Sequence, residues 1–182
     1  FLRYWFEVDY KRIGFRFVDS SQAKQSSQKW FPYNKGGQFR KWYGNDEYVI
    51  NWQNDGAEIK IAVVNNPSDP NTTHWSRRIF NTEYFFKSCV TWGDVTIASF
   101  SARWKPEGFI SDGVGVGIYN LKQWDYRAVL GLLNSSVSNT FTKILCPTVH
   151  FTPGAMSLIP VKFGDDQDLT HIVSRCIELA RE

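Results

Sequence analysis

The sequence has little of what disulfide-bonded, metal-binding or membrane-spanning proteins need. Its 182 residues include only 3 cysteines and 3 histidines, widely separated and without a Cys-x-x-Cys pair. That spacing excludes a disulfide framework and a zinc knuckle and is typical of a reducing compartment, so we expect a cytoplasmic protein. No apolar run approaches the roughly 20 residues that cross a bilayer, and no signal-peptide pattern is present. Because the chain begins at Phe1 rather than Met, we expect a fragment of a larger protein.

Groups suited to catalysis are also scarce. His74, His150 and His171 lie far apart, and none has partners at the spacing of a metal site or a catalytic triad. The glycines of residues 113–117 follow a predicted strand, but no helix-like turn opens on them as a dinucleotide-binding loop requires. We therefore expect no catalytic, cofactor-binding or metal-binding residues in this chain.

Aromatic and basic residues are abundant instead, and both are concentrated near the N-terminus. Aromatics make up 16% of the chain, and half of them fall within residues 1–52. Residues 1–45 carry nine Lys or Arg against three Asp or Glu, whereas residues 46–162 are neutral and residues 163–182 have a net charge of −3. This asymmetry predicts that a polyanion binds the N-terminal third, with a solvated basic face as the alternative.

Residues 29–45 combine the two features, because four cations alternate there with six aromatics around a Gly-Gly pair. Cations neutralise phosphates, and aromatic rings stack on bases or brace a loop. The candidate DNA contacts in this segment are Lys35, Gly36, Gly37, Arg40, Lys41, Trp42 and Tyr43. We expect the three cations to bind phosphates, the glycines to allow close approach of the backbone, and the two aromatics to brace the loop or stack on DNA.

Three arginines elsewhere are candidates for contacts with base edges. Arg77 and Arg78 follow Trp75, and Arg103 lies within an otherwise apolar predicted strand. Arginine is the usual bidentate partner of guanine in the major groove. For Arg103, an ion pair at the edge of the core is the alternative.

The apolar patterns predict a mixed α/β (α+β) fold, in which a twisted sheet is flanked by helices. The expected strands are a strand or hairpin within residues 1–17, and strands at 48–52, 95–104 and 108–111, the last two joined as a hairpin across 105–107. The expected helices cover residues 126–145, where Pro147 follows, and the tail from about Leu169 to Ala180. Residues 58–64 fit a strand or a helix, 54–56 a turn and 65–73 a loop.

Several runs of residues resemble a known family. The stretch Lys29–Asn45, followed by Val49-Ile-Asn-Trp52 and Asn54-Asp-Gly56, is similar to large bacterial adenine-specific DNA methyltransferases of the phage-exclusion (BREX) system and its type IIG restriction-modification relatives. Downstream, Asn81–Lys87 and the run from Phe100 to Phe109 extend the similarity. Leu130–Ser135, with Leu145-x-Pro147, resembles the end of target-recognition domains, which also occur in type I specificity subunits. The resemblance covers about residues 1–162.

The resemblance implies a DNA target-recognition domain over residues 1–162 and a C-terminal helical segment over 163–182 that leads into a region outside this chain. The family's methyl-transfer motif, Asn/Asp-Pro-Pro-Tyr/Phe, is reduced here to Asn66-Pro67-Ser68, and the family's Gly-rich cofactor loop is absent. The implied partners are double-stranded DNA and the catalytic methyltransferase domain of the same parent chain, which would bind S-adenosylmethionine. Two alternatives stay open: a module that docks on another subunit, and a fragment with its own methyltransferase or nuclease activity.

Overall fold

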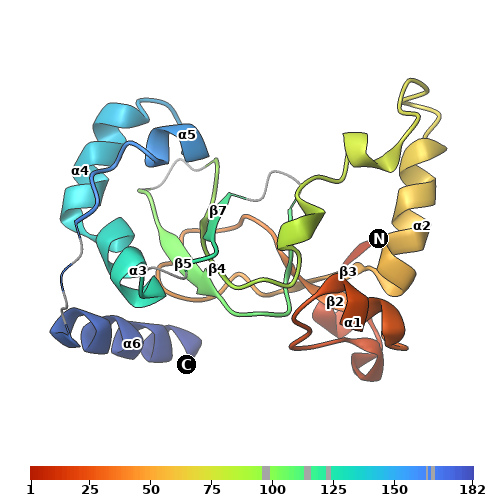
Figure 1. Cartoon of the computed structure of the whole chain (residues 1–182), viewed down its shortest axis with the longest axis horizontal. Helices are drawn as coiled ribbons and strands as arrows, with labels where there is room; N and C mark the ends of the chain where they lie inside the picture. The colour runs from red at the N-terminus through yellow and green to blue at the C-terminus, as the bar shows by residue number, and fades with distance from the viewer. Residues whose placement is uncertain (96–98, 113–115, 122–123, 163, 165–166) are drawn as a thin grey trace. The chain divides into compact units, whose positions relative to one another are not determined.

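The computed structural model describes residues 1–95, 99–112, 116–121, 124–162, 164 and 167–182. The chain divides into two compact units. Unit 1 comprises Phe1–Lys35, Asp46–Lys87 and Pro106–Gly115, and unit 2 comprises Gly36–Asn45, Ser88–Lys105 and Val116–Glu182. Each unit has its own β-sheet with helices beside it, which confirms the predicted mixed α/β class (Figure 1).

Unit 1 is built on a four-stranded sheet in the order β1-β3-β2-β6. Its strands are β1 (Leu2–Tyr4), β3 (Tyr48–Asn51), β2 (Trp30–Asn34) and β6 (Ile110–Ser111), and its helices are α1 (Ser20–Gln25) and α2 (Gln53–Val64). The first three strands are antiparallel, whereas β6 runs parallel to β2, with Ile110 opposite Tyr33. Buried aromatic rings, including Phe31, Trp52 and Phe86, form the core of this unit.

The entry to α2 confirms the predicted turn at residues 54–56. Asn54, Asp55 and Gly56 all have positive φ, of 52°, 59° and 70°. Asn, Asp and Gly are the residues that adopt this conformation most readily. The chain then continues as a helix through Val64, so residues 58–64 are helical rather than extended.

The N-terminal segment departs from the predicted strand or hairpin. Only Leu2–Tyr4 is a strand, and short 3-10 helices follow at Trp5–Glu7 and Tyr10–Arg12. The Glu7 carboxylate accepts the Tyr4 N–H at 2.7 Å, and the Asp9 carboxylate accepts the N–H of Lys11. Such local side-chain bonds to the backbone compete with a strand ladder, which explains why the alternating apolar pattern was misleading.

The predicted hairpin across residues 105–107 is wrong. Strand β6 pairs with β2 of unit 1, and the expected partner strand pairs with β4 of unit 2. Gly108 turns the chain with a φ of 103°, and its N–H donates to the Phe86 carbonyl at 3.1 Å. A β-carbon at Gly108 would lie 2.8 Å from the Arg16 backbone nitrogen, so this close approach requires glycine.

Unit 2 is built on a three-stranded antiparallel sheet in the order β5-β4-β7. Its strands are β4 (Cys89–Trp92), β5 (Ala102–Lys105) and β7 (Gly117–Tyr119), and its helices are α3 (Tyr126–Asn134), α4 (Ser136–Leu145), α5 (Pro153–Met156) and α6 (Gln167–Arg181). The strand predicted over 95–104 is therefore confirmed only at its end, and residues 96–98 lie outside the described residues. Of the glycine run at 113–117, residues 113–115 also lie outside them, and Gly117 begins a strand.

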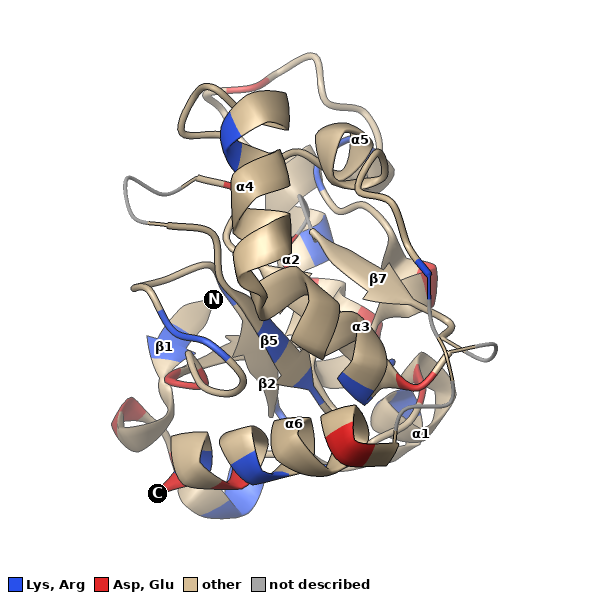
Figure 2. Ribbon diagram, turned by 90° about the vertical axis from the view of Figure 1, so that its left-hand side faces the viewer, with Lys and Arg blue, Asp and Glu red and all other residues tan. Residues whose placement is uncertain are grey.

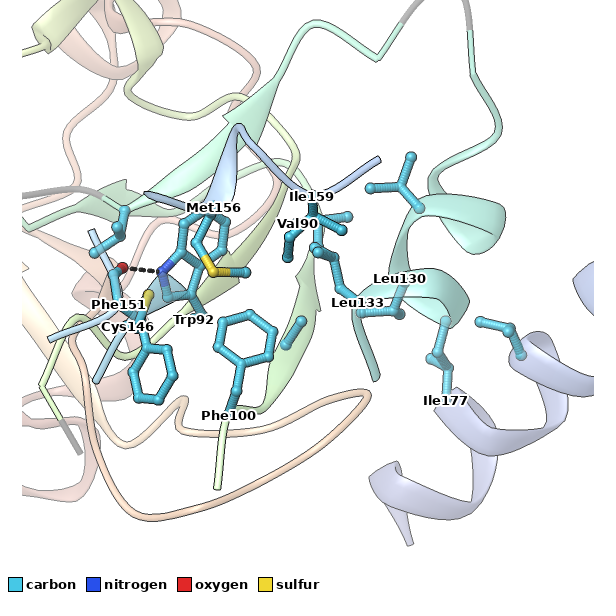
Figure 3. Close-up of a cluster of buried hydrophobic side chains, with 14 residues drawn as sticks. Val90, Trp92, Phe100, Leu130, Leu133, Cys146, Phe151, Met156, Ile159 and Ile177 are labelled. Atoms are coloured by element: carbon cyan, nitrogen blue, oxygen red, sulfur yellow. Dashed lines mark hydrogen bonds between the residues drawn. The ribbon is translucent and has the colours of Figure 1, made fainter. Parts of the chain in front are cut away.

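The core of unit 2 forms where β4 meets the helices (Figure 3). Val90 and Trp92 of β4 pack there with Leu130 of α3 and Ile177 of α6. The Trp92 indole N–H, which needs a partner once buried, donates to the Phe151 carbonyl at 2.7 Å. Full burial of such apolar side chains stabilises the fold by about 1.5–3 kcal/mol each.

The helix predicted over 126–145 is two helices. It breaks at Ser135, whose hydroxyl accepts the Ser138 N–H at 3.2 Å and so caps α4. The predicted tail helix is confirmed as α6, which packs on α3. A β-carbon at Gly131 would lie 3.0 Å from a Val173 methyl group, so glycine allows the two helices to approach closely. No helix among the described residues has the length and apolar character to cross a membrane.

Candidate nucleic-acid interface

The described residues contain no group of three or more His, Cys, Asp or Glu side chains that could hold a metal ion. Two of the three cysteines, Cys89 and Cys146, are buried. Burial raises the pKa of Cys89 to about 12, so its thiol stays protonated at neutral pH and is a poor nucleophile. The sequence-based candidates to be placed in the structure are basic and aromatic side chains and two glycines.

Residues Gly36–Asn45, here called the basic loop, lie along the exposed edge of the sheet of unit 2. The Trp42 N–H donates to the Ala102 carbonyl at 2.9 Å, and the Trp104 N–H donates to the Trp42 carbonyl at 2.8 Å. These two bonds form a short parallel bridge between the loop and β5. The loop therefore covers backbone groups that an edge strand would otherwise leave unpaired.

Two basic residues of β5, which are blue on that strand in Figure 2, donate hydrogen bonds to the loop backbone. Lys105 is fully buried, and its Nζ donates to the Gly44 carbonyl at 2.7 Å and the Asn45 carbonyl at 3.1 Å. Burial, followed by the charge of Arg40, lowers the pKa of Lys105 to about 7. Arg103 is 1% exposed, and its Nη1 donates to the Arg40 carbonyl at 3.4 Å.

Asn134, at the end of α3, ties the helix to both β5 and the loop. Its side-chain amide donates to the Ala102 carbonyl and accepts the Ala102 N–H, each at 2.9 Å. The same Ala102 carbonyl also accepts the Trp42 N–H, and the Asn134 backbone carbonyl accepts Lys41 Nζ at 3.1 Å. Sequence reasoning missed this residue, although an asparagine that ends an apolar helix stripe just before a serine cap was an available signal.

The base of the loop is closed by backbone conformations that favour particular residues. Trp42, Gly44 and Asn45 have φ of 73°, 115° and 60°, so the positive values fall here and not at the Gly36-Gly37 pair. A β-carbon at Gly44 would lie 2.9 Å from Arg40 Cδ, because the arginine stem lies over this glycine. The Asn45 amide donates to the Gln38 carbonyl at 3.1 Å and joins the two ends of the loop's outer part.

Exposure divides the basic loop into two parts. Residues 36–40 are exposed, whereas Trp42 and Tyr43 are half-buried and pack against the core of unit 2. The Arg181 guanidinium lies 4.5 Å from the centre of the Tyr43 ring. These contacts favour bracing over DNA stacking for the two aromatics. Phe39, absent from the sequence-based candidates, is the exposed aromatic of the loop, with 48% of its surface accessible.

The remaining candidates, Arg77, Arg78 and Lys35, belong to unit 1. Arg77 and Arg78 are exposed, and the Arg78 guanidinium is paired with Asp69, with an Nε–Oδ2 distance of 2.8 Å. Hydrogen bonds from Thr72 and Arg78 lower the pKa of Asp69. Lys35 Nζ lies 4.5 Å from the centre of the Tyr48 ring, in a cation–π contact.

No family model matches the chain, but two known proteins are similar to it. The chain is 34% identical over 182 residues to the adenine-specific methyltransferase PglX of Lacticaseibacillus casei (strain Zhang). It is 32% identical over 184 residues to the adenine-specific methyltransferase BrxX of Escherichia coli O9:H4 (strain HS). Both alignments cover the whole chain, but it spans only 15% and 13% of the length of these relatives. The chain is therefore homologous to a segment of adenine-specific methyltransferases, which confirms that part of the resemblance.

Proposed function

We propose that this chain recognises double-stranded DNA for an adenine-specific methyltransferase of a phage-defence system. Methyl transfer and S-adenosylmethionine binding belong, in this proposal, to another domain of the parent chain. The observation that carries the proposal is the basic loop, whose exposed cation Arg40 stands on a buried scaffold that includes Lys105 and Arg103. Homology to small segments of adenine-specific methyltransferases supports it.

In this proposal, the residues of the basic loop contribute to DNA binding in different ways. Arg40 is exposed and suited to a phosphate, and its side chain lies over Gly44, where a β-carbon would be 2.9 Å from Arg40 Cδ and 3.0 Å from Arg40 Nη1. Gly36 and Gly37 expose backbone beside it, and a β-carbon at Gly36 would meet nothing within 4 Å. Lys41, with one contact already made to the Asn134 carbonyl, adds positive charge at the base of the loop. We assign the four loop residues Gly36, Gly37, Arg40 and Lys41 to binding of the DNA backbone.

Arg103 requires a revised role in this proposal. Its side chain is 1% exposed and directed to the Arg40 carbonyl, so in this conformation it positions the loop and does not present itself to a base. Replacement with alanine discriminates the two roles. A positioning residue lowers the affinity for all sequences alike, whereas a base-reading residue relaxes the preference at one position of the site.

The proposal is tested by fluorescence anisotropy of the chain with labelled duplex DNA at increasing salt. We expect a steep loss of affinity between about 50 and 200 mM salt, because phosphate contacts release counterions. Arg40→Ala should weaken binding to every sequence by about tenfold and lower the salt slope by about one. The matched control is Arg175→Ala, an exposed arginine on α6 that is paired with Glu178. Absence of salt-dependent binding by the unmodified chain would contradict the proposal.

A second candidate function, docking on another protein subunit, is favoured by the aromatic surface of unit 1. Six aromatic side chains near the N-terminus are 40–65% exposed: Phe1, Tyr4, Trp5, Phe6, Tyr10 and Phe15. Exposed apolar patches often mark protein interfaces. Complex formation that is insensitive to salt and lost on Phe6→Ala would favour this function over DNA binding.

A further inference from the structure

One apolar side chain stands out at the exposed end of the basic loop. Residues 36–40 are Gly-Gly-Gln-Phe-Arg, so Phe39 is the one large apolar residue among them, and 48% of its surface is accessible. The other two aromatics of the loop, Trp42 and Tyr43, pack against the core of unit 2. Because burying a phenyl ring is favourable, the exposed ring of Phe39, and not the two half-buried ones, is the aromatic of this loop that is available to a ligand.

The loop holds Phe39 in place through contacts on either side of it. The Asn45 amide donates to the Gln38 carbonyl, immediately before Phe39, and Arg103 donates to the Arg40 carbonyl, immediately after it. Lys105 fixes the carbonyls of Gly44 and Asn45, where the loop returns to the sheet. A side chain presented by an anchored backbone binds with less loss of conformational entropy than one on a mobile loop.

The residues that flank Phe39 favour a partner that carries both negative charge and aromatic rings. Arg40 follows it and Gln38 precedes it, both as exposed residues, and the Gly36-Gly37 pair adds no side chain. The loop contains no Asp or Glu between residues 36 and 45. An apolar ring and a cation on consecutive residues are complementary to a DNA step, where stacked bases lie next to a phosphate.

We propose that Phe39 is a wedge that enters the DNA stack beside the phosphate held by Arg40. This inference rests on the proposed DNA-binding function and extends it by assigning the ring a base step as its ligand. The wedge partly unstacks the two base pairs at that step and kinks the duplex there. Phe39 thereby fixes the position of the loop along the DNA and favours steps that unstack easily.

The test uses the whole chain and short duplexes selected by its binding from a randomised pool, with 2-aminopurine substituted for adenine at successive positions. Because unstacking brightens 2-aminopurine, we expect the unmodified chain to raise the fluorescence at one step only. Phe39→Ala should abolish that rise and weaken binding by about tenfold, the usual effect of losing a stacking ring, while the dependence on salt persists. Phe39→Trp should keep the rise. The matched control is Phe80→Ala, a phenylalanine of unit 1 that is 47% exposed.

Two failures are distinguishable. If the unmodified chain shows no salt-dependent binding, the proposed function fails, and the wedge fails with it. If the chain binds in a salt-dependent way but Phe39→Ala retains full affinity and the same fluorescence rise, only the wedge is overturned. Loss of binding to a protein subunit in Phe39→Ala, with DNA binding intact, would also overturn it and assign the ring to a protein pocket.

Discussion

The basic loop of unit 2 and the arginine pair of unit 1 place the same chemical group on the surface by different means. In the loop, the supporting hydrogen bonds from Arg103 and Lys105 go to backbone carbonyls, and the Arg40 side chain is left exposed. In unit 1, the Arg78 guanidinium is itself engaged by the Asp69 carboxylate. An arginine is available to a phosphate when its backbone is held, and less so when its head group is held.

The two regions also differ in what they bury. The loop rests on a fully buried lysine and a nearly buried arginine, whereas the Arg78–Asp69 pair lies at the surface, with 61% of the Arg78 side chain exposed. Burying a cation is costly unless its donors are satisfied. The loop is therefore held by buried donors to its backbone carbonyls, whereas the arginine pair is an exposed ion pair, which contributes little to stability.

The largest expected effect comes from Asn134, which links α3, β5 and the loop. Asn134→Ala leaves the buried Ala102 N–H without its side-chain acceptor. We expect the free energy of unfolding to fall by about 3 kcal/mol. Urea denaturation measures this loss. The matched control is Asn66→Ala, whose side chain accepts one exposed N–H, and it should change stability by less than about 1 kcal/mol. If the two substitutions lower the free energy of unfolding equally, Asn134 does not anchor the basic loop more strongly than an ordinary surface contact.

The second effect is a pH dependence that comes from Lys105. Its pKa is about 7 in the folded chain and about 10.4 when unfolded, so between these values the unfolded chain binds a proton that the folded chain does not. The contribution of Lys105 to stability should therefore rise with pH, by about 2 kcal/mol between pH 7 and pH 9. Urea denaturation at a series of pH values measures the rise. Lys105→Met should flatten the profile in this range, and a rise that persists in the variant would assign it to other groups.

The smallest expected effect concerns the Arg78–Asp69 pair of unit 1. Asp69→Asn removes the carboxylate that engages Arg78 and leaves an amide oxygen that can still accept the Thr72 hydroxyl. We expect DNA affinity to rise by about twofold, because one more cation becomes available to phosphates. Salt-dependent anisotropy measures the change. If Arg78→Ala in the Asp69→Asn background leaves this gain intact, the gain does not come from Arg78.

Local sequence patterns predicted the elements whose cause is local. The stripe of Ile172, Val173 and Ile177 predicted α6, and the prolines and asparagines of residues 65–73 predicted a loop. The parallel pairing of β6 with β2 was not predictable, because it joins residues about 77 positions apart in the chain and depends on burial of Ile110 in unit 1. The break at Ser135 was missed because the apolar stripe continues across it.

The candidate site was predictable in composition and not in geometry. Interleaved cations and aromatics identified the basic loop, but the same pattern could not tell the exposed Phe39 from the half-buried Trp42 and Tyr43. Lys105, at the end of an apolar strand, has the sequence signature of an exposed residue. Its burial follows from the loop lying over it, which is a long-range contact that no local pattern encodes.

The hydrogen bonds that anchor the basic loop are accepted by main-chain atoms, so they restrict very little which substitutions can accumulate in the loop during evolution. The carbonyls of Ala102, Arg40, Gly44 and Asn45 are present whatever side chains those positions carry. The scaffold therefore constrains the length of residues 36–40 and the turn that follows, but not the chemistry that they display. A tip of equal length and different side chains would seat in the same place, so the chemistry that residues 36–40 display can diverge, or be exchanged by grafting, without rebuilding the domain beneath it.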